Sequence, residues 1–179
     1  MRRRIPMTPT DIWPMLRTLL AERFGLKARI VQREMAAFSL VRAREDGTLG
    51  PDLERSTADC GMPRGCGVAP FGRNGGFAMR ATGQSMAVLT RLISQALGQP
   101  VLDRTGLEGA YDFELAFDTS DLAARAAQSG LIPPGVATTP SDNPPLATAL
   151  QEQLGLKLER QRAPIEVVVI EAATMPVPD

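Results

Sequence analysis

Apolar side chains recur every four residues in three stretches of the chain, and each stretch ends in an apolar residue followed by glycine. Spacings of four keep side chains on one face of an α-helix. Glycine at the next position is typical of a helix C-terminus, because it adopts a positive φ without steric cost. The pattern predicts three helices with these buried faces and terminal glycines: Leu16, Leu20, Phe24 and Gly25; Leu89, Ile93, Leu97 and Gly98; Leu146, Leu150, Leu154 and Gly155.

Polar residues and prolines mark the starts of these helices. Thr8 is a candidate N-cap, with Pro9 at the first helical position. Pro14 removes a backbone donor and should kink a helix, so the first helix begins either at Pro9 or at Pro14. Ser85 and Asn143 are the candidate N-caps of the second and third helices.

Strand-like stretches follow each glycine, and a turn leads from each to a second strand. Strict alternation of apolar and polar residues over Tyr111–Phe117 predicts a half-buried strand. The run at 165–170 is almost wholly apolar, which predicts a central strand covered on both faces. The expected strand pairs are 26–31 with 37–41, 101–102 with 111–117, and 156–158 with 165–170, and a further strand is expected at 77–80.

The fold class predicted from these patterns is α+β, with three copies of a helix-then-β-hairpin unit and helices packed on antiparallel or mixed sheet. Two segments, residues 44–76 and 118–143, break the pattern. Loops of this length are usually functional or mobile. The short helix expected at 122–128 lies in the second. The predicted organisation is a disordered N-terminus (1–7), a first unit (8–43), a Gly/Pro/Cys loop (44–76), a second unit (77–117), a flexible loop (118–143), a third unit (144–173) and a tail (174–179).

Composition narrows the possible functions. Twenty basic and twenty acidic residues give a net charge of zero, which argues against nucleic-acid binding, because that needs surplus positive charge. The absence of histidine excludes a Ser-His-Asp or Cys-His nucleophile and any His-ligated metal. No apolar run approaches the ~20 residues that span a bilayer, so we expect no membrane insertion. No apolar stretch follows the basic start at residues 1–4, so no export signal is expected in the chain as written. We predict no catalytic centre and no cofactor or metal site.

The two cysteines, Cys60 and Cys66, stand in a loop rich in glycine and proline. Two thiols alone do not make a structural zinc site, and the spacing is not the Cys-x-x-Cys of redox catalysts. Two interpretations remain open. A disulfide closing the loop would imply an oxidising compartment, whereas two unpaired thiols would imply nothing about location.

The most distinctive local string runs from residue 103 to residue 113. A structural interpretation makes it a connection between strands, because short polar side chains bond nearby backbone donors and glycines permit turn dihedrals. A functional interpretation pairs Asp103 with Asp112 for acid–base chemistry, but nothing positions a substrate between them. We favour the structural role for the motif Asp103, Arg104, Thr105, Gly106, Gly109, Tyr111 and Asp112.

A second glycine-rich string, at residues 71–77, lacks the order of a phosphate or dinucleotide loop. It precedes an expected strand and not a helix. We therefore predict a hairpin turn at Asn74 and Gly75.

Three strings give the chain a family resemblance: residues 15–27; residues 83–101 with 103–107 and 111–113; and residues 149–159 with 163–167. They resemble an uncharacterised, soil-associated family expanded in acidobacteria, a domain of unknown function. The resemblance implies no catalytic residues, because no activity is established for the family. Its members are usually longer and begin with a signal peptide, which implies a periplasmic or secreted location and a truncated chain here. A looser resemblance is to the short N-terminal modules of secretins and TonB-dependent receptors.

The expected function is that of a non-enzymatic cell-envelope module that binds a protein or peptide, by strand addition at a sheet edge. One alternative is a hydrolase-like enzyme that uses carboxylates such as Asp103 and Asp112. Another is a truncated paralogue without independent function. A cleft with converging carboxylates of raised pKa would favour the enzyme, and an open sheet edge with an apolar groove would favour the binding module.

Overall fold

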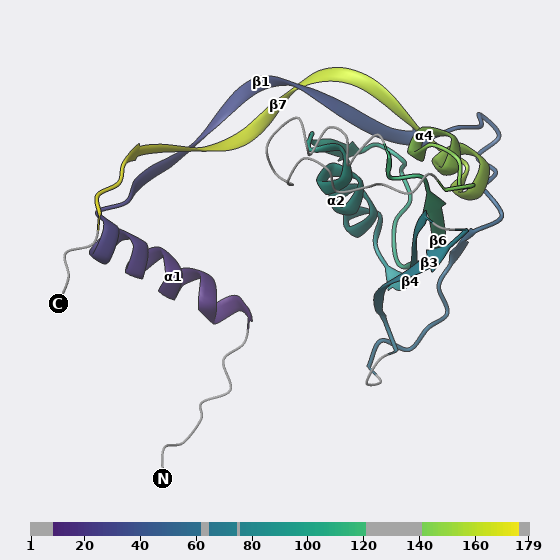
Figure 1. Ribbon diagram of the computed structural model, residues 1–179, viewed down its shortest axis with the longest axis horizontal. Helices are drawn as coiled ribbons and strands as arrows, with labels where there is room; N and C mark the ends of the chain where they lie inside the picture. Colours follow the sequence, from purple (N-terminus) through teal and green to yellow (C-terminus); the bar gives the residue numbers. More distant parts are fainter. Residues whose placement is uncertain (1–8, 62–64, 75, 121–140, 176–179) are drawn as a thin grey trace, which may run out of the picture. The chain divides into compact units, whose positions relative to one another are not determined.

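The computed structural model describes residues 9–61, 65–74, 76–120 and 141–175, with the side chains of 9–13 left aside. The chain divides into two compact units (Figure 1). The first, here called the terminal unit, consists of Met1–Met35 and Ala163–Asp179. The second, the central unit, is Ala36–Arg162.

The described residues form three helical segments and two sheets, which confirms the predicted α+β class. A three-stranded mixed sheet has the order β5-β1-β7, and a four-stranded antiparallel sheet has the order β2-β6-β4-β3. The helices are α1 (Pro9–Phe24), α2 (Met86–Leu97) and α4 (Leu146–Ala149), which continues as the π-helical turn η1 (Leu150–Leu154). The strands are β1 (Lys27–Arg42), β2 (Leu53–Arg55), β3 (Gly67–Arg73), β4 (Gly76–Gln84), β5 (Val101–Asp103), β6 (Tyr111–Phe117) and β7 (Leu156–Ala172).

The core of the central unit joins the apolar face of the four-stranded sheet, the helices α2 and α4–η1, and Leu40, Val101 and Leu156 of the three-stranded sheet. The predicted faces of these helices are buried except at Leu97, which is half-buried, and Ile93 and Leu150 are at most 1% exposed. Both helices end before a glycine in the left-handed region, with φ of 64° at Gly98 and 67° at Gly155. The apolar positions of β6 are buried against them, as the alternation predicted.

The first helix departs from this pattern. It begins at Pro9 and carries Pro14 inside it, but the face predicted to be core is open. Leu16 and Phe24 are 39% and 37% exposed, and Leu20 is only half-buried. The prediction of a buried face was wrong here, because helical spacing shows which side chains share a face and not whether another element covers that face.

The helix-then-hairpin prediction was also wrong, and the described residues show no threefold repeat. Residues 27–42 and 156–172 each form one continuous strand, β1 and β7, because these two long strands pair with each other and do not fold back. The strands β5 and β6 lie in different sheets, since β5 pairs in parallel with β1 through Phe38↔Val101. The strand that follows each helix nevertheless joins the same sheet.

The apolar run at 165–170 is not a central strand. It belongs to β7, an edge strand of the three-stranded sheet, and Val168 and Ile170 are 68% and 63% exposed. Its sequence is typical of a strand covered on both faces, but alternate residues of the run are exposed.

The segment 44–76, predicted to be a loop, contains β2 and β3. These strands escaped the sequence pattern because β2 has only three residues and β3 contains two glycines and Pro70. A hairpin joins β3 and β4 at the predicted place, since Arg73 pairs with Gly76 and Asn74 has φ of 50°, while Gly75 lies outside the described residues. The expected strand at 77–80 lies within β4.

Of the N-caps predicted for the second and third helices, one is found at the predicted residue and the other is not. Ser85 is the N-cap residue of α2, although its side chain makes no capping hydrogen bond. Asn143 does not cap the third helix, whose N-cap is Pro145, because the Asn143 amide donates instead to the Arg73 carbonyl at 2.9 Å. The expected N-terminal segment 1–7 and the expected helix at 122–128 lie outside the described residues. Within the described ranges, no helix has the length and apolar character needed to cross a membrane.

Candidate functional site

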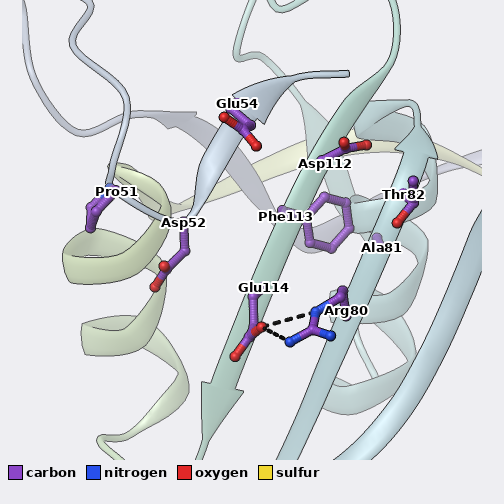
Figure 2. A pocket seen from close by; sticks show the side chains of 9 residues that line it. All are labelled: Pro51, Asp52, Glu54, Arg80, Ala81, Thr82, Asp112, Phe113 and Glu114. Carbon is purple, nitrogen blue, oxygen red and sulfur yellow. Dashed lines mark hydrogen bonds and ion pairs between the residues drawn. The ribbon is translucent and has the colours of Figure 1, made fainter. Parts of the chain in front are cut away.

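An open hollow of about 330 Å³ lies on the polar face of the four-stranded sheet, over β2, β6 and β4 (Figure 2). Carboxylates dominate its charged groups, with four acids against one arginine. The residues that line it are Pro51, Asp52, Glu54, Arg80, Ala81, Thr82, Asp112, Phe113 and Glu114.

Strand alternation places the acids on this face. Tyr111, Phe113 and Leu115 point into the core, so Asp112 and Glu114 lie on the opposite side of β6. The antiparallel pairing of β2 with β6 sets Leu53 beside Phe113. The same register sets Glu54 directly opposite Asp112.

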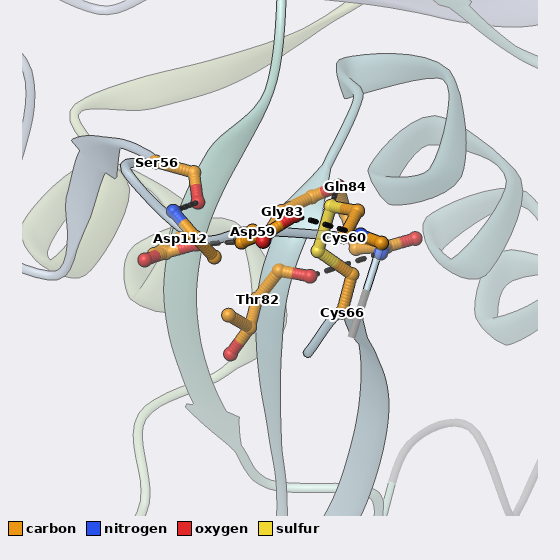
Figure 3. The surroundings of a disulfide bond; sticks show 10 residues. Ser56, Asp59, Cys60, Cys66, Thr82, Gly83, Gln84 and Asp112 are labelled. Atoms are coloured by element: carbon orange, nitrogen blue, oxygen red, sulfur yellow. Dashed lines mark hydrogen bonds between the residues drawn. A yellow bond between two sulfur atoms is a disulfide. The ribbon is translucent and has the colours of Figure 1, made fainter. Parts of the chain in front are cut away.

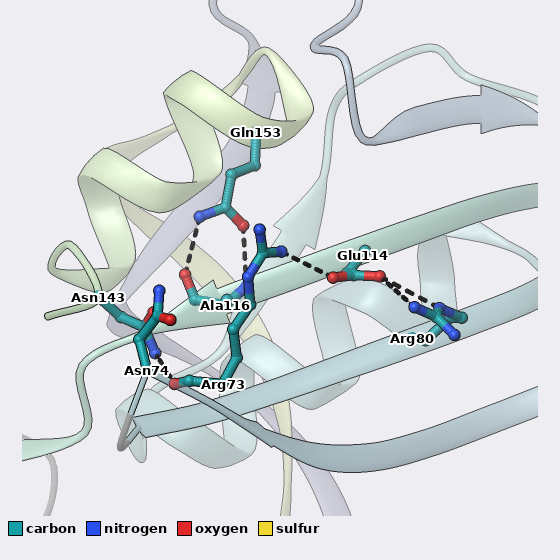
Figure 4. A network of polar contacts seen from close by, with 7 residues as sticks. All are labelled: Arg73, Asn74, Arg80, Glu114, Ala116, Asn143 and Gln153. Carbon is teal, nitrogen blue, oxygen red and sulfur yellow. Dashed lines mark hydrogen bonds and ion pairs between the residues drawn. The ribbon is translucent and has the colours of Figure 1, made fainter. Parts of the chain in front are cut away.

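The charges of the hollow are unevenly compensated, and Figure 4 shows the two arginines that contact Glu114. Glu114 forms ion pairs with Arg73, at 2.7 Å, and with Arg80, at 2.8 Å. Asp112 accepts the backbone N–H of Gly83 at 2.7 Å. No hydrogen bond or ion pair joins the side chains of Asp52 and Glu54 to any described residue. Like charges directly opposite in a sheet repel, so the Glu54–Asp112 side of the hollow favours a cation.

Beyond its pairing with the short strand β2, the backbone of β6 is hydrogen-bonded by other groups (Figure 4). The side-chain amide of Gln153 accepts from the Ala116 N–H and donates to the Ala116 carbonyl, both at 2.8 Å. The N–H of Asp118 donates to the Pro144 carbonyl at 2.9 Å. The longer free edge of the sheet is therefore β3, which is mostly exposed and contains Pro70, a residue without a backbone donor.

Two carboxyl groups outside the hollow have a lowered pKa. The backbone N–H of Thr48, at 2.9 Å, is the main cause of the lowered pKa of Asp46. Desolvation raises the pKa of Asp118, but hydrogen bonds from Ser120 and Ser141 outweigh it. Both carboxylates therefore serve as local hydrogen-bond acceptors for loops.

Metal chemistry has no support in the part of the chain that the structure describes. No group of three or more His, Cys, Asp or Glu side chains converges there in a way that could hold an ion.

A family model described as "Protein of unknown function (DUF3738)" matches residues 4–173, which is most of the chain. The chain belongs to the DUF3738 family. Comparison with curated proteins and with solved structures found no match.

In this DUF3738 chain, the motif singled out from the sequence divides between two places. Asp103 ends β5 and accepts from the backbone N–H of Thr105 at 3.0 Å and from its hydroxyl at 2.7 Å. The same hydroxyl accepts the N–H of Leu107, and the Arg104 N–H donates to the Leu40 carbonyl. These contacts form a turn.

The rest of the motif belongs to the four-stranded sheet or leads into it. Gly106 and Gly109 have φ of 67° and 96°, which suits the connection between β5 and β6. Tyr111 is buried with Arg55 over its ring, 5.4 Å from the centroid. Asp112 alone reaches the hollow, and Asp103 lies in the other sheet.

Cys60 and Cys66 form a disulfide in the DUF3738 structure, with Cα atoms 5.0 Å apart (Figure 3). The pair packs against Gly83 of β4, whose N–H is held by Asp112. A Cβ atom at Gly83 would overlap the Sγ of Cys66 and lie 2.7 Å from the Sγ of Cys60. The position therefore requires glycine both for this contact and for its φ of 63°.

We expect Gly83→Ala to destabilise the oxidised protein by about 2–4 kcal/mol, from left-handed strain and from overpacking against the sulfurs. Urea unfolding measures the change. Gly98→Ala is the matched control, because Gly98 has φ of 64° and a Cβ atom there would have no other atom within 4 Å. Equal losses for the two variants would contradict the packing argument.

Sequence reasoning missed Asp52, Glu54, Arg80 and Glu114 as parts of one site. The signal was present as two acid-x-acid pairs, 52 with 54 and 112 with 114, since alternate residues of a strand share a face. Only the second pair fell in a predicted strand. Their meeting depends on the β2–β6 register, which the DUF3738 sequence does not display.

Proposed function

We propose that this chain is a non-enzymatic cell-envelope module that binds an extended, basic segment of a protein or peptide. The observation that carries the proposal is the pair of uncompensated carboxylates, Asp52 and Glu54, in an open hollow beside Asp112. A cationic side chain placed there gains an ionic partner and relieves the repulsion between Glu54 and Asp112.

The spacing of the acids suits an extended partner. Side chains two residues apart in a strand lie about 7 Å from each other on one face. Asp52 lies in the turn directly before β2 and Glu54 lies on β2, both lining the hollow, and a partner in extended conformation repeats its own side chains at a comparable interval. Basic residues at alternate positions of the partner would therefore meet both acids.

The sheet edges offer the backbone part of such recognition. The outer side of β3 has no neighbour in the strand order, and an exposed edge can accept an added strand. Pro70 interrupts the row of donors on β3. The outer edge of β2 is shorter but borders the hollow.

The disulfide supports the envelope compartment, because such bonds persist in oxidising surroundings. The resemblance to envelope modules and to a soil-associated family with exported members points the same way.

Fluorescence anisotropy with a labelled peptide of alternating Arg and Val tests the proposal, and a peptide of alternating Glu and Val is the comparison. We expect saturable binding of the basic peptide only. The double variant Asp52→Asn with Glu54→Gln should weaken that binding about tenfold, which corresponds to ~1.4 kcal/mol. Glu108→Gln, an exposed acid outside the hollow, is the matched control and should bind as the parent does.

Two results would overturn the proposal. One is equal affinity of the parent and the double variant for the basic peptide. The other is hydrolysis of a panel of ester, peptide and glycoside substrates by the parent that is lost in a normally folded Asp112→Asn variant, which would favour the carboxylate enzyme.

A further inference from the structure

A β-bulge interrupts β4 beside the hollow. The pairing of β4 with β6 shifts register between Ala81 and Gln84. Two residues of β4, Thr82 and Gly83, therefore lie opposite the single residue Asp112 of β6. Bulges leave one residue outside the ladder and re-aim side chains next to functional sites. Here the carboxylate of Asp112 accepts the N–H of Gly83 at 2.7 Å, so the position of this hollow-lining side chain depends on the shape of the bulge.

The disulfide contacts the same bulge (Figure 3). The space beside the α-carbon of Gly83 is filled by the Sγ atoms of Cys60 and Cys66. The Sγ of Cys60 also lies 3.9 Å from the Gly83 carbonyl oxygen. Cys66 directly precedes Gly67, which pairs with Thr82 in the bulge. Disulfide, bulge and carboxylate therefore form one series of contacts that ends in the hollow.

The bond is accessible to a reductant in solution. Cys60 is exposed and Cys66 is half-buried, and neither belongs to the buried core of the central unit. Exposed disulfides are the labile and regulatory ones, whereas structural disulfides resist reduction. The two cysteines are six positions apart, and closing so short a loop constrains the unfolded chain less than a long-range bond would. We therefore expect reduction to leave the core folded and to act locally at the bulge.

We propose that the bond between Cys60 and Cys66 is a redox modification site for a dithiol reductant, and that its reduction releases Asp112 in the hollow. A thiolate of the dithiol attacks the exposed Sγ of Cys60, a mixed disulfide forms, and Cys66 leaves as a thiolate. The second thiol of the reductant then attacks its own sulfur in the mixed disulfide and releases Cys60. Two electrons and two protons pass to the cysteine pair, and the reductant becomes a disulfide.

The oxidised form is the binding-competent form in this account. Its sulfurs hold Gly83, and Gly83 holds Asp112 directly opposite Glu54. A site whose groups are already in place loses less conformational entropy when a ligand binds. Two separate thiols no longer keep a fixed position against Gly83, so Asp112 turns away from the like charge of Glu54. For its ligand, the basic segment, the inference rests on the proposed function.

Amide hydrogen exchange tests the structural part without a ligand. Dithiothreitol should raise exchange at the Gly83 N–H of the parent about tenfold, as expected for the loss of one hydrogen bond to a charged group. The Ala116 N–H is the internal control and should not change, since the side chain of Gln153 holds it at 2.8 Å. The double variant Cys60→Ser with Cys66→Ser should exchange at the faster rate with or without dithiothreitol.

Anisotropy with the peptide of alternating Arg and Val measures the effect on the hollow. We expect reduction to weaken binding about fivefold, at the low end of typical coupling between two sites. Asp112→Ala should bind more weakly than the oxidised parent and equally in both redox states, because it lacks the group that the bulge positions.

Three results would overturn the inference: unchanged exchange at Gly83 on reduction, a matching rise at Ala116 that indicates general unfolding, or equal affinity of the oxidised and reduced parent for the peptide. A parent that binds no basic peptide in either redox state would contradict the proposed function instead. Exchange at Gly83 would then still decide whether reduction releases Asp112, so the two proposals can fail separately.

Discussion

We expect Gly155→Ala to lower the free energy of unfolding by about 2–5 kcal/mol, the sum of left-handed strain and a collision with backbone. Gly155 has φ of 67° where the third helix ends. A Cβ atom there would lie 2.5 Å from the Gly50 nitrogen and 3.0 Å from the Leu49 carbonyl carbon. Backbone atoms yield less readily than a flexible side chain, so the variant must move the 49–50 loop.

The same Gly98→Ala variant that serves for Gly83 separates the two contributions. Gly98 also ends a helix with φ of 64°, but nothing lies within 4 Å of its ideal Cβ position. Gly98→Ala should therefore lower the free energy of unfolding only through left-handed strain, by about 1–2 kcal/mol. Urea unfolding of both variants measures the difference. Losses that agree within error would show that the Gly50–Gly155 approach does not stabilise the fold.

We expect Leu150→Ala to cost about 2–5 kcal/mol, because it removes a fully buried side chain and leaves a cavity. Ile93→Ala should cost a similar amount for the same reason. Leu16→Ala is the control on α1. Its side chain is 39% exposed, so the loss should be clearly smaller, near the ~0.5 kcal/mol typical of surface positions.

Chemical denaturation followed by circular dichroism checks the three variants side by side. Comparable losses for Leu150 and Leu16 would contradict the division of the chain into a packed central unit and an open terminal unit.

Local patterns predicted the parts of the fold that depend on neighbouring residues. The glycines after α2 and η1, the alternation of β6 and the turn at Asn74 follow from residues a few positions apart. The glycines and the turn follow from backbone preference, and the alternation of β6 follows from the burial of one face of the strand. These features needed no knowledge of distant contacts.

Strand partners and burial of α1 could not be predicted in the same way. Whether residues 27–42 form a hairpin or one long strand depends on β7, more than 110 positions away. The repeat of apolar residues suggested equal units, but equal helix patterns do not specify equal surroundings, as the exposed Leu16 and the buried Leu150 show. Pairing of long strands outweighed the local turn preferences.

The candidate site was only partly visible in the sequence for the same reason. Asp112 and Glu114 could be placed on the polar face of a strand, whereas Asp52 and Glu54 precede and occupy a strand of three residues. Only the register Glu54↔Asp112 brings the two pairs together. The disulfide likewise depends on a fold that holds the cysteines against Gly83.

The most direct test of the central claim is amide chemical-shift mapping of the full chain as the peptide of alternating Arg and Val is added. Binding at the hollow predicts dose-dependent shifts at residues 52–54, 80–82 and 112–114, with little change at residues 27–35 and 163–172 of the terminal unit. Shifts confined to the terminal unit, or no saturable shift around Glu54 at millimolar peptide, would contradict the account.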